Sequence, residues 1–139
     1  MAGPGKTVDV AEADSHAERT SGKRAYRAGV TVAIATSFLI VWTTVVRDDG
    51  TGIGFFLVIM AAGVGGYAAR FRPAGMARTM LGIAIMQLLY AIAVATAPVT
   101  ANLPGGVLRA VLSGAVFAAL WLASANLFRA AATRNTDAA

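Results

Sequence analysis

The sequence predicts an all-α integral membrane protein whose four transmembrane helices form two hairpins. Apolar residues make up 57% of the 139-residue chain and charged residues only 14%, whereas soluble domains carry about 25% charged residues. The few charges also divide the chain into four long uncharged runs. Each run has the roughly 19 residues that a helix needs to cross about 30 Å of hydrocarbon. The runs are Ala28–Val46, Gly50–Ala69, Thr79–Leu108 and Ala110–Phe128.

The main alternative is a soluble bundle, and the composition disfavours it. Helices that are apolar on every side need lipid or a much larger protein around them. The net charge of +5 suggests nucleic-acid binding, but the basic residues flank the apolar runs, where they contact lipid head groups instead. The chain has no cysteine, which excludes disulfide bonds, cysteine-ligated metals and thiol catalysis.

The first segment, residues 1–22, is polar and mixed in charge. It buries too little apolar surface to offset the entropy cost of ordering. We therefore expect a disordered cytoplasmic tail, in which Asp9–Glu18 forms at most a transient helix. A basic cluster follows, formed by Lys23, Arg24 and Arg27.

A four-helix transmembrane domain is expected over residues 23–130, with its first helix at about residues 25–46. Small residues recur every four positions on this helix, at Ala25, Gly29, Ala33 and Ser37. Such a stripe lets transmembrane helices approach closely. The turn signal Asp48-Asp49-Gly50 separates it from the second helix.

The second helix is expected at about residues 53–69, and its second half is almost entirely small. We expect this half to make the closest helix contact in the protein. A basic hinge, Ala69–Arg78, then joins the two predicted hairpins. It contains three arginines and a Pro-Ala-Gly turn.

The second hairpin consists of helices at about residues 77–97 and 107–130, followed by a short cytoplasmic tail at 131–139. The first of these ends before Pro98, which disfavours its continuation. Arg27–Ile34 resembles Arg78–Ile85, so a duplication of one hairpin remains an open alternative.

The distribution of lysine and arginine predicts the orientation. Ten of the twelve lie in the N-terminal segment, in the hinge or after the fourth helix, and only Arg47 and Arg109 lie at the opposite ends of the spans. Because basic residues are retained on the cytoplasmic side, we expect both termini and the hinge in the cytoplasm. The predicted location is the bacterial inner membrane, with several spans.

The sequence carries no catalytic, cofactor or metal-binding constellation. The one histidine, His16, lies in the N-terminal tail, and the four uncharged runs contain no histidine or acid. Haem or metal ligation and proton-coupled transport normally need such residues at depth. We therefore expect a protein that is not an enzyme and binds no cofactor.

Two groups of residues are candidate contacts. Gln87, Tyr90 and Asn126 are polar groups within the spans. We expect them to bond between helices, the alternative being a polar lining for a solute path centred on Gln87 and Tyr90.

The second group comprises the hinge arginines Arg70, Arg72 and Arg78. Together with the cationic ends of the first and fourth helices, these arginines are candidates for contact with anionic lipid head groups or an acidic partner. The alternative is that they only set the orientation.

Two motifs resemble a group of uncharacterised small four-helix inner-membrane proteins of proteobacteria. They are Ala69–Met80, with its ARFRPAGMAR loop, and Phe117–Arg129. The group often has an Asn-Pro loop before its second helix, where this chain has Asp48–Thr51. The resemblance implies an inner-membrane location and no particular activity.

The expected function is that of an accessory or structural subunit of a membrane assembly. Its expected partners are the lipid bilayer, other membrane proteins or further copies of itself, and not nucleic acid. The alternative is a small transporter or channel for a neutral or anionic solute. Small multidrug exporters fit less well because the first span has no glutamate, and small fluoride channels because the charge bias here is strong.

Overall fold

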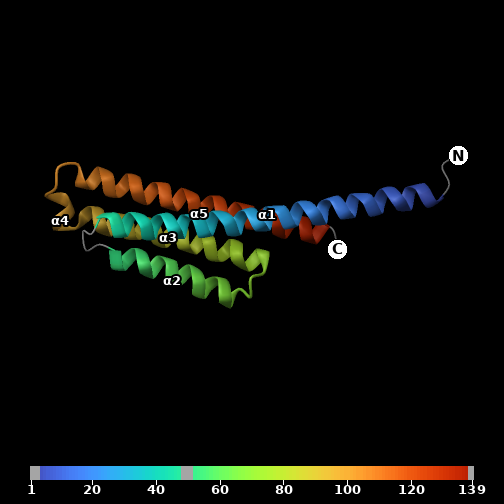
Figure 1. Cartoon of the computed structure of the whole chain (residues 1–139), viewed down its shortest axis with the longest axis horizontal. Coiled ribbons are helices and arrows are strands. Elements are labelled where there is room, and N and C mark those ends of the chain that lie inside the picture. The colour runs from blue at the N-terminus through green and yellow to red at the C-terminus, as the bar shows by residue number, and fades with distance from the viewer. Residues whose placement is uncertain (1–3, 48–51, 138–139) are drawn as a thin grey trace.

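The computed structural model describes residues 4–47 and 52–137, and these are almost entirely helical (Figure 1). No strand occurs in this part of the chain, so the predicted all-α class is confirmed. The elements are α1 (Pro4–Arg47), α2 (Gly52–Ala68), α3 (Pro73–Thr96), α4 (Pro98–Ala101) and α5 (Gly106–Asp137). The predicted turn at residues 48–50 lies outside the described residues.

Three of these helices, α1, α3 and α5, are long and apolar enough to cross a membrane. The fourth expected span, α2, is apolar but has only 17 residues. At 1.5 Å per residue it covers about 26 Å, slightly less than the roughly 30 Å of a hydrocarbon core. Length and composition therefore give three candidate membrane-spanning helices, and whether α2 also crosses depends on how it is connected to them.

Helix α1 corrects the expected disordered tail. It is continuous from Pro4 to Arg47 and has 44 residues, so the region expected to be disordered forms its first turns and projects beyond the bundle (Figure 1). From Gly5 to Thr20 every side chain is exposed except the half-buried Ser15. Tertiary packing does not hold this stretch. Its alanine, glutamate and arginine residues favour helix, and a helix already formed downstream extends without a new nucleation cost.

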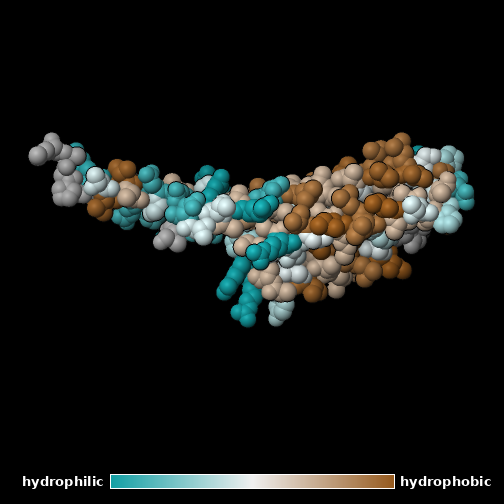
Figure 2. All heavy atoms as spheres, turned by 180° about the vertical axis from the view of Figure 1, so that it is seen from behind, coloured by the Kyte–Doolittle hydropathy of each residue, from teal (hydrophilic) through white to brown (hydrophobic). Residues whose placement is uncertain are grey.

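Helix α5 likewise continues to Asp137 through most of the expected C-terminal tail. The reason is tertiary, because this extension lies against α1. Arg134 Nη1 donates a hydrogen bond of 2.6 Å to Ser21 Oγ, and Ala131 is completely buried. The C-terminal part of α5 therefore packs on α1 around Ser21, whereas the turns of α1 before Ser21 project further. Figure 2 shows hydrophilic side chains over this end of the molecule and hydrophobic ones over the bundle.

The hinge is shorter than expected because α3 begins at Pro73 instead of near residue 77. Proline is favoured in the first turn of a helix, where its missing N–H has no partner to lose. At the other end, α3 stops at Thr96, as the proline at position 98 predicts. The single turn α4 then leads into α5.

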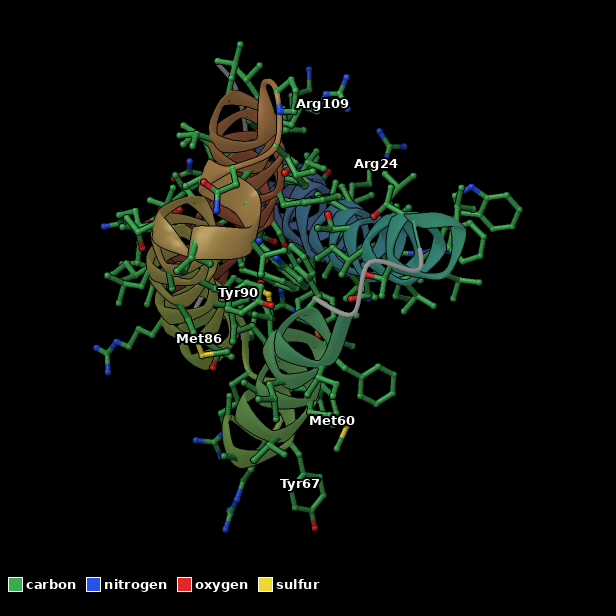
Figure 3. The ribbon with its side chains drawn as sticks, turned by 90° about the vertical axis from the view of Figure 1, so that its left-hand side faces the viewer. Arg24, Met60, Tyr67, Met86, Tyr90 and Arg109 are labelled. Atoms are coloured by element: carbon green, nitrogen blue, oxygen red, sulfur yellow. The ribbon has the colours of Figure 1, made fainter. Side chains whose placement is uncertain are left out.

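The four long helices form a ring in which α5 packs on both α1 and α3, and α3 packs on α2. Helices α1 and α2 close the ring more loosely, and they diverge in the end-on view (Figure 3). Trp121 and Phe128 of α5 are 0% exposed at the centre of the core. The principal neighbour of α1 is therefore α5, and not α2 as two separate hairpins would require.

Close helix contacts occur at small residues, but not mainly in the second half of α2. A Cβ atom added to Gly114 of α5 would overlap Ala91 of α3, and one added to Gly29 of α1 would lie 3.2 Å from the Phe128 ring. In α2, Gly65 faces Thr79 closely, whereas Gly63 faces open space. The close approach predicted for this half of α2 is thus confined to one side of the helix.

Candidate functional site

The hinge is a tight turn with two residues in the left-handed backbone region. Arg70 and Phe71 have φ values of 50° and 54°, which is unfavourable for side chains other than glycine by about 1 kcal/mol or more per residue. Two backbone hydrogen bonds hold the turn, from Phe71 N to the Gly66 carbonyl (3.2 Å) and from Arg70 N to the Tyr67 carbonyl (2.9 Å). This is the pattern of a Schellman motif, with an arginine where glycine is usual.

The three hinge arginines predicted as contacts, Arg70, Arg72 and Arg78, all have exposed side chains. Arg72 is the N-cap of α3, but its side chain makes no capping hydrogen bond. Asn126, a candidate for bonding between helices, is exposed on α5. The observed anchor of the hinge is Tyr26 of α1. The arginines are therefore accessible. Arg70 and Arg72 lie in the turn that Tyr26 anchors, whereas Arg78 lies in the second turn of α3.

Tyr26 joins three segments that are far apart in the sequence. Its hydroxyl donates a 2.9 Å hydrogen bond to the Phe71 carbonyl in the hinge. Its ring packs edge-on against Phe128 of α5, with centroids 5.2 Å apart. Tyr26 thereby places three segments at the same end of the bundle: the beginning of the apolar part of α1, the hinge and the later part of α5.

Next to this anchor lies a cavity of about 490 Å³, here called the basic pocket. It is lined by Gly22, Lys23, Tyr26, Arg27, Phe71, Pro73 and Asn135. The sequence groups the cationic end of α1 with the hinge arginines as a possible contact for a lipid head group or an acidic partner, but it predicts no pocket there and places Asn135 in a tail. Asn135 reaches this position through the packing of α5 on α1. No signal in the sequence predicts that position.

A second cavity, of about 570 Å³, lies between the diverging helices α1 and α2 and is here called the apolar groove. Its walls come from α1 and α2, and Met76, Met80 and Trp121 contribute from α3 and α5. Phe71 lines both this groove and the basic pocket. The two cavities are therefore neighbours that share one side chain.

At the opposite end, a cavity of about 420 Å³ lies beneath α4 and includes Arg109. Arg109 is exposed and lies on the outer side of α5 (Figure 3). Asp48 and Asp49, which the predicted topology puts at the same end as Arg109, lie outside the described part of the chain.

Gln87 and Tyr90 do not share one polar surface. Gln87 is 0% exposed in the core, and neither of its amide atoms has a hydrogen-bond partner among the described residues. Tyr90 points inward from α3 (Figure 3) and packs edge-on against Phe55 of α2, with centroids 4.9 Å apart. Neither residue lines the basic pocket, the apolar groove or the cavity beneath α4.

The outward face of α5 combines a stripe of small side chains and one amide with larger apolar side chains such as Leu112 and Val116. Ala115, Ala119 and Ala123 recur every four residues and are all exposed, as is Asn126 one turn further on. The buried face of α5 is formed by a different set, which includes Phe117, Trp121 and Phe128. This stripe of small residues therefore faces outward and is not used within the described part of the chain.

Among the described residues, no group of three or more acidic or histidine side chains is placed to hold a metal ion. The arrangement offers instead cationic, amide and apolar surfaces. Comparison with protein-family models, curated proteins and solved structures finds no match to this chain.

Proposed function

We propose that this chain is a multi-pass inner-membrane protein that acts as a non-enzymatic accessory or structural subunit of a membrane assembly. We also propose that it is related to the proteobacterial four-helix group through the hinge motif. The observation that carries the proposal is the outward stripe of α5, where Ala115, Ala119 and Ala123 are exposed beside Asn126. In lipid, small residues permit close helix approach and an amide bonds across helices. A second helix would therefore bury a face that this chain leaves open.

The connections support α2 as a fourth span. Tyr26 of α1 is bonded to the hinge, and Arg47 lies 21 residues further along the same helix, or about 32 Å away at 1.5 Å per residue. If α1 crosses the membrane, the chain enters α2 on the far side and returns to the hinge on the near side. This path requires α2 to cross, with slight bilayer thinning or flanking polar residues accommodating its length.

The proposed orientation places the hinge and both termini in the cytoplasm. Cysteine labelling tests it in intact cells. A cysteine at the exposed position Ala74 is expected to be protected from a membrane-impermeant thiol reagent, and one at the exposed position Ala101 is expected to react. The reverse pattern would overturn the orientation, and reaction at both positions would overturn the four-span path.

The subunit proposal is tested by purification in mild detergent. Ala119→Leu places bulk on the outward stripe of α5, so the loss of a co-purifying protein or of self-association is expected. Ala93→Leu is the matched control, because Ala93 is exposed on α3 away from the stripe. A strictly monomeric wild-type protein that brings down no other protein would remove the proposal.

One observation favours the alternative of a small transporter or channel for a neutral or anionic solute. The amide of Gln87 is fully buried and lacks a partner among the described residues, which is a costly arrangement unless another state uses it. Solute flux in proteoliposomes tests this. Flux that falls with Gln87→Leu supports a path at this depth, and the absence of flux in the wild type removes it.

A further inference from the structure

We propose that the basic pocket and the apolar groove together bind one anionic phospholipid. The phosphate of the head group lies at Lys23 and Arg27, and an acyl chain lies between α1 and α2. This inference adds a ligand to the molecule and does not depend on the subunit proposal. The hinge arginines expected from the sequence to contact lipid are not the residues that line either cavity.

The first argument is continuity between a cationic and an apolar cavity. Phe71 lines both, and the hydrogen bond of its carbonyl with Tyr26 fixes this part of the hinge. The basic pocket lies beside the first apolar turns of α1, where charged residues give way to the apolar run beginning at Ala28. A phospholipid has the same order of parts, with a charged phosphate followed by hydrocarbon.

The second argument is the charge of the pocket. Lys23 and Arg27 lie one turn apart on α1 and both line the cavity. The neighbouring Arg24 points away from the bundle (Figure 3). No acidic side chain is among the described residues lining the pocket, and Asn135 adds an amide donor. Two cations and an amide complement a phosphodiester, and basic residues near the membrane surface attract anionic lipids.

The third argument is the length of the groove. On α1 its lining extends from Val30 to Val41, about 17 Å at 1.5 Å per residue. That length is close to the roughly 15 Å of hydrocarbon in one leaflet, half of the whole core. On α2 the lining runs from Ile59 to Gly66, the half nearest the hinge. A transmembrane helix of a partner needs a groove of full membrane depth, whereas an acyl chain needs one leaflet.

The composition and size of the groove fit the same occupant. Apart from Ser37, whose hydroxyl bonds to the Ala33 carbonyl of its own helix at 2.9 Å, the polar atoms of lining side chains are limited to the indole N–H of Trp121. The volume of about 570 Å³ lies within the roughly 300–1,000 Å³ typical of ligand sites. Gly63 lines the groove, and a Cβ atom built on it would have no neighbour within 4 Å. A large side chain at this position would therefore occupy space in the groove.

Native mass spectrometry of the full-length protein tests the head-group site. The protein is released from detergent with phosphatidylglycerol or phosphatidylcholine added at equal concentration. We expect one tightly bound phosphatidylglycerol per chain and a preference over phosphatidylcholine of about tenfold, since each basic residue at the surface contributes measurably to anionic-lipid binding. Lys23→Gln with Arg27→Gln is expected to abolish most of this preference. Arg24→Gln with Arg72→Gln removes the same charge outside the pocket and is expected to change it less than twofold.

The groove is tested by Gly63→Leu, which fills the open space at its wall. Bound phosphatidylglycerol is expected to fall about tenfold. Gly82→Leu is the matched control, because Gly82 also faces open space but does not line the groove. Both changes replace glycine with a better helix former, so the helices are retained, and circular dichroism checks this.

Three results would overturn the proposal. The first is equal loss of lipid with the pocket and control variants, which would indicate a general surface effect. The second is unchanged binding in Gly63→Leu. The third is displacement of the lipid by millimolar inorganic phosphate, which would show that a free anion suffices and that no chain occupies the groove. Ala119→Leu is expected to leave lipid binding unchanged, so failure here and failure of the subunit proposal are distinguishable.

Discussion

Gln87 shows how much folding free energy one buried polar side chain costs when its amide has no hydrogen-bond partner among the described residues. Its amide is fully buried on α3, and both polar atoms lack partners among the described residues. An unsatisfied buried polar group costs about 1–3 kcal/mol. By contrast, the buried Ser124 of α5 is satisfied, since its hydroxyl donates a 2.9 Å hydrogen bond to the Gly29 carbonyl of α1. Loss of the polar atoms is therefore expected to change the free energy of unfolding in opposite directions at these two residues.

Gln87→Met keeps the length of the side chain and removes the amide. We expect the free energy of unfolding to rise by about 1 kcal/mol, because an unpaired polar group is replaced by an apolar one of similar shape. Denaturant titration in detergent micelles measures it. Ser124→Ala, which breaks a made hydrogen bond, is expected to lower stability by about 1 kcal/mol. A loss of stability in Gln87→Met would show that the amide is bonded after all.

At the scale of whole elements, the pairing of the helices rests on small residues at a few crossing points. Gly114 of α5 meets Ala91 of α3, and Gly29 of α1 meets Phe128. In each case the absence of a Cβ atom allows two backbones or a backbone and a ring to approach. Small stripes in the sequence indicate that such contacts exist, but they do not indicate which pairs form.

Gly114→Ala introduces a Cβ atom that overlaps Ala91. We expect a loss of about 1–3 kcal/mol in the free energy of unfolding, since overpacking forces the helices apart. Gly82→Ala on the open face of α3 is the control and is expected to be neutral or stabilising by up to about 1 kcal/mol, because alanine favours helix. Thermal unfolding in detergent compares the two. Similar effects in both would contradict the contact between α3 and α5.

At the scale of the whole molecule, the ring of helices is closed on three sides and loose between α1 and α2. That loose side holds the apolar groove, and the C-terminal turns of α5 pack on α1 at the adjacent end of the bundle. The helical extension of α1, residues 5–20, is exposed except for the half-buried Ser15. Hydrogen bonds from Arg134 of α5 to Ser21 hold α1 at the base of this extension. The extension therefore depends on α5 at its base.

Arg134→Gln tests this tie. Removal of the hydrogen bonds from Arg134 to Ser21 is expected to raise amide hydrogen exchange several-fold near Ser21, since local opening no longer breaks a tertiary contact. The stability of the bundle is expected to change by less than about 0.5 kcal/mol, as for an exposed site. Arg129→Gln, on the exposed side of the same helix, is the control. Unchanged exchange at Ser21 would contradict the pairing.

The sequence alone determined the class of the protein and most of its helix boundaries. Long uncharged runs are a local property, and the length required to cross a membrane follows from helix geometry. For that reason α2 was expected at 53–69 and begins at Gly52, and α3 ends at Thr96, two residues before Pro98. The two polar tails were expected to lie outside the helices, because helix continuation from a folded neighbour is not visible in composition.

Which helices meet and which residues form cavities follows from tertiary packing. Ser124 bonds to a carbonyl 95 residues away, and Asn135 reaches the basic pocket because α5 lies along α1. Such contacts depend on the fit of side chains between helices that are equally apolar, so hydrophobicity does not select among them. Charge distribution drew attention to the arginines of the hinge. Packing placed Lys23 and Arg27 of α1 beside Phe71, at the head of a groove that exists only because α1 and α2 diverge.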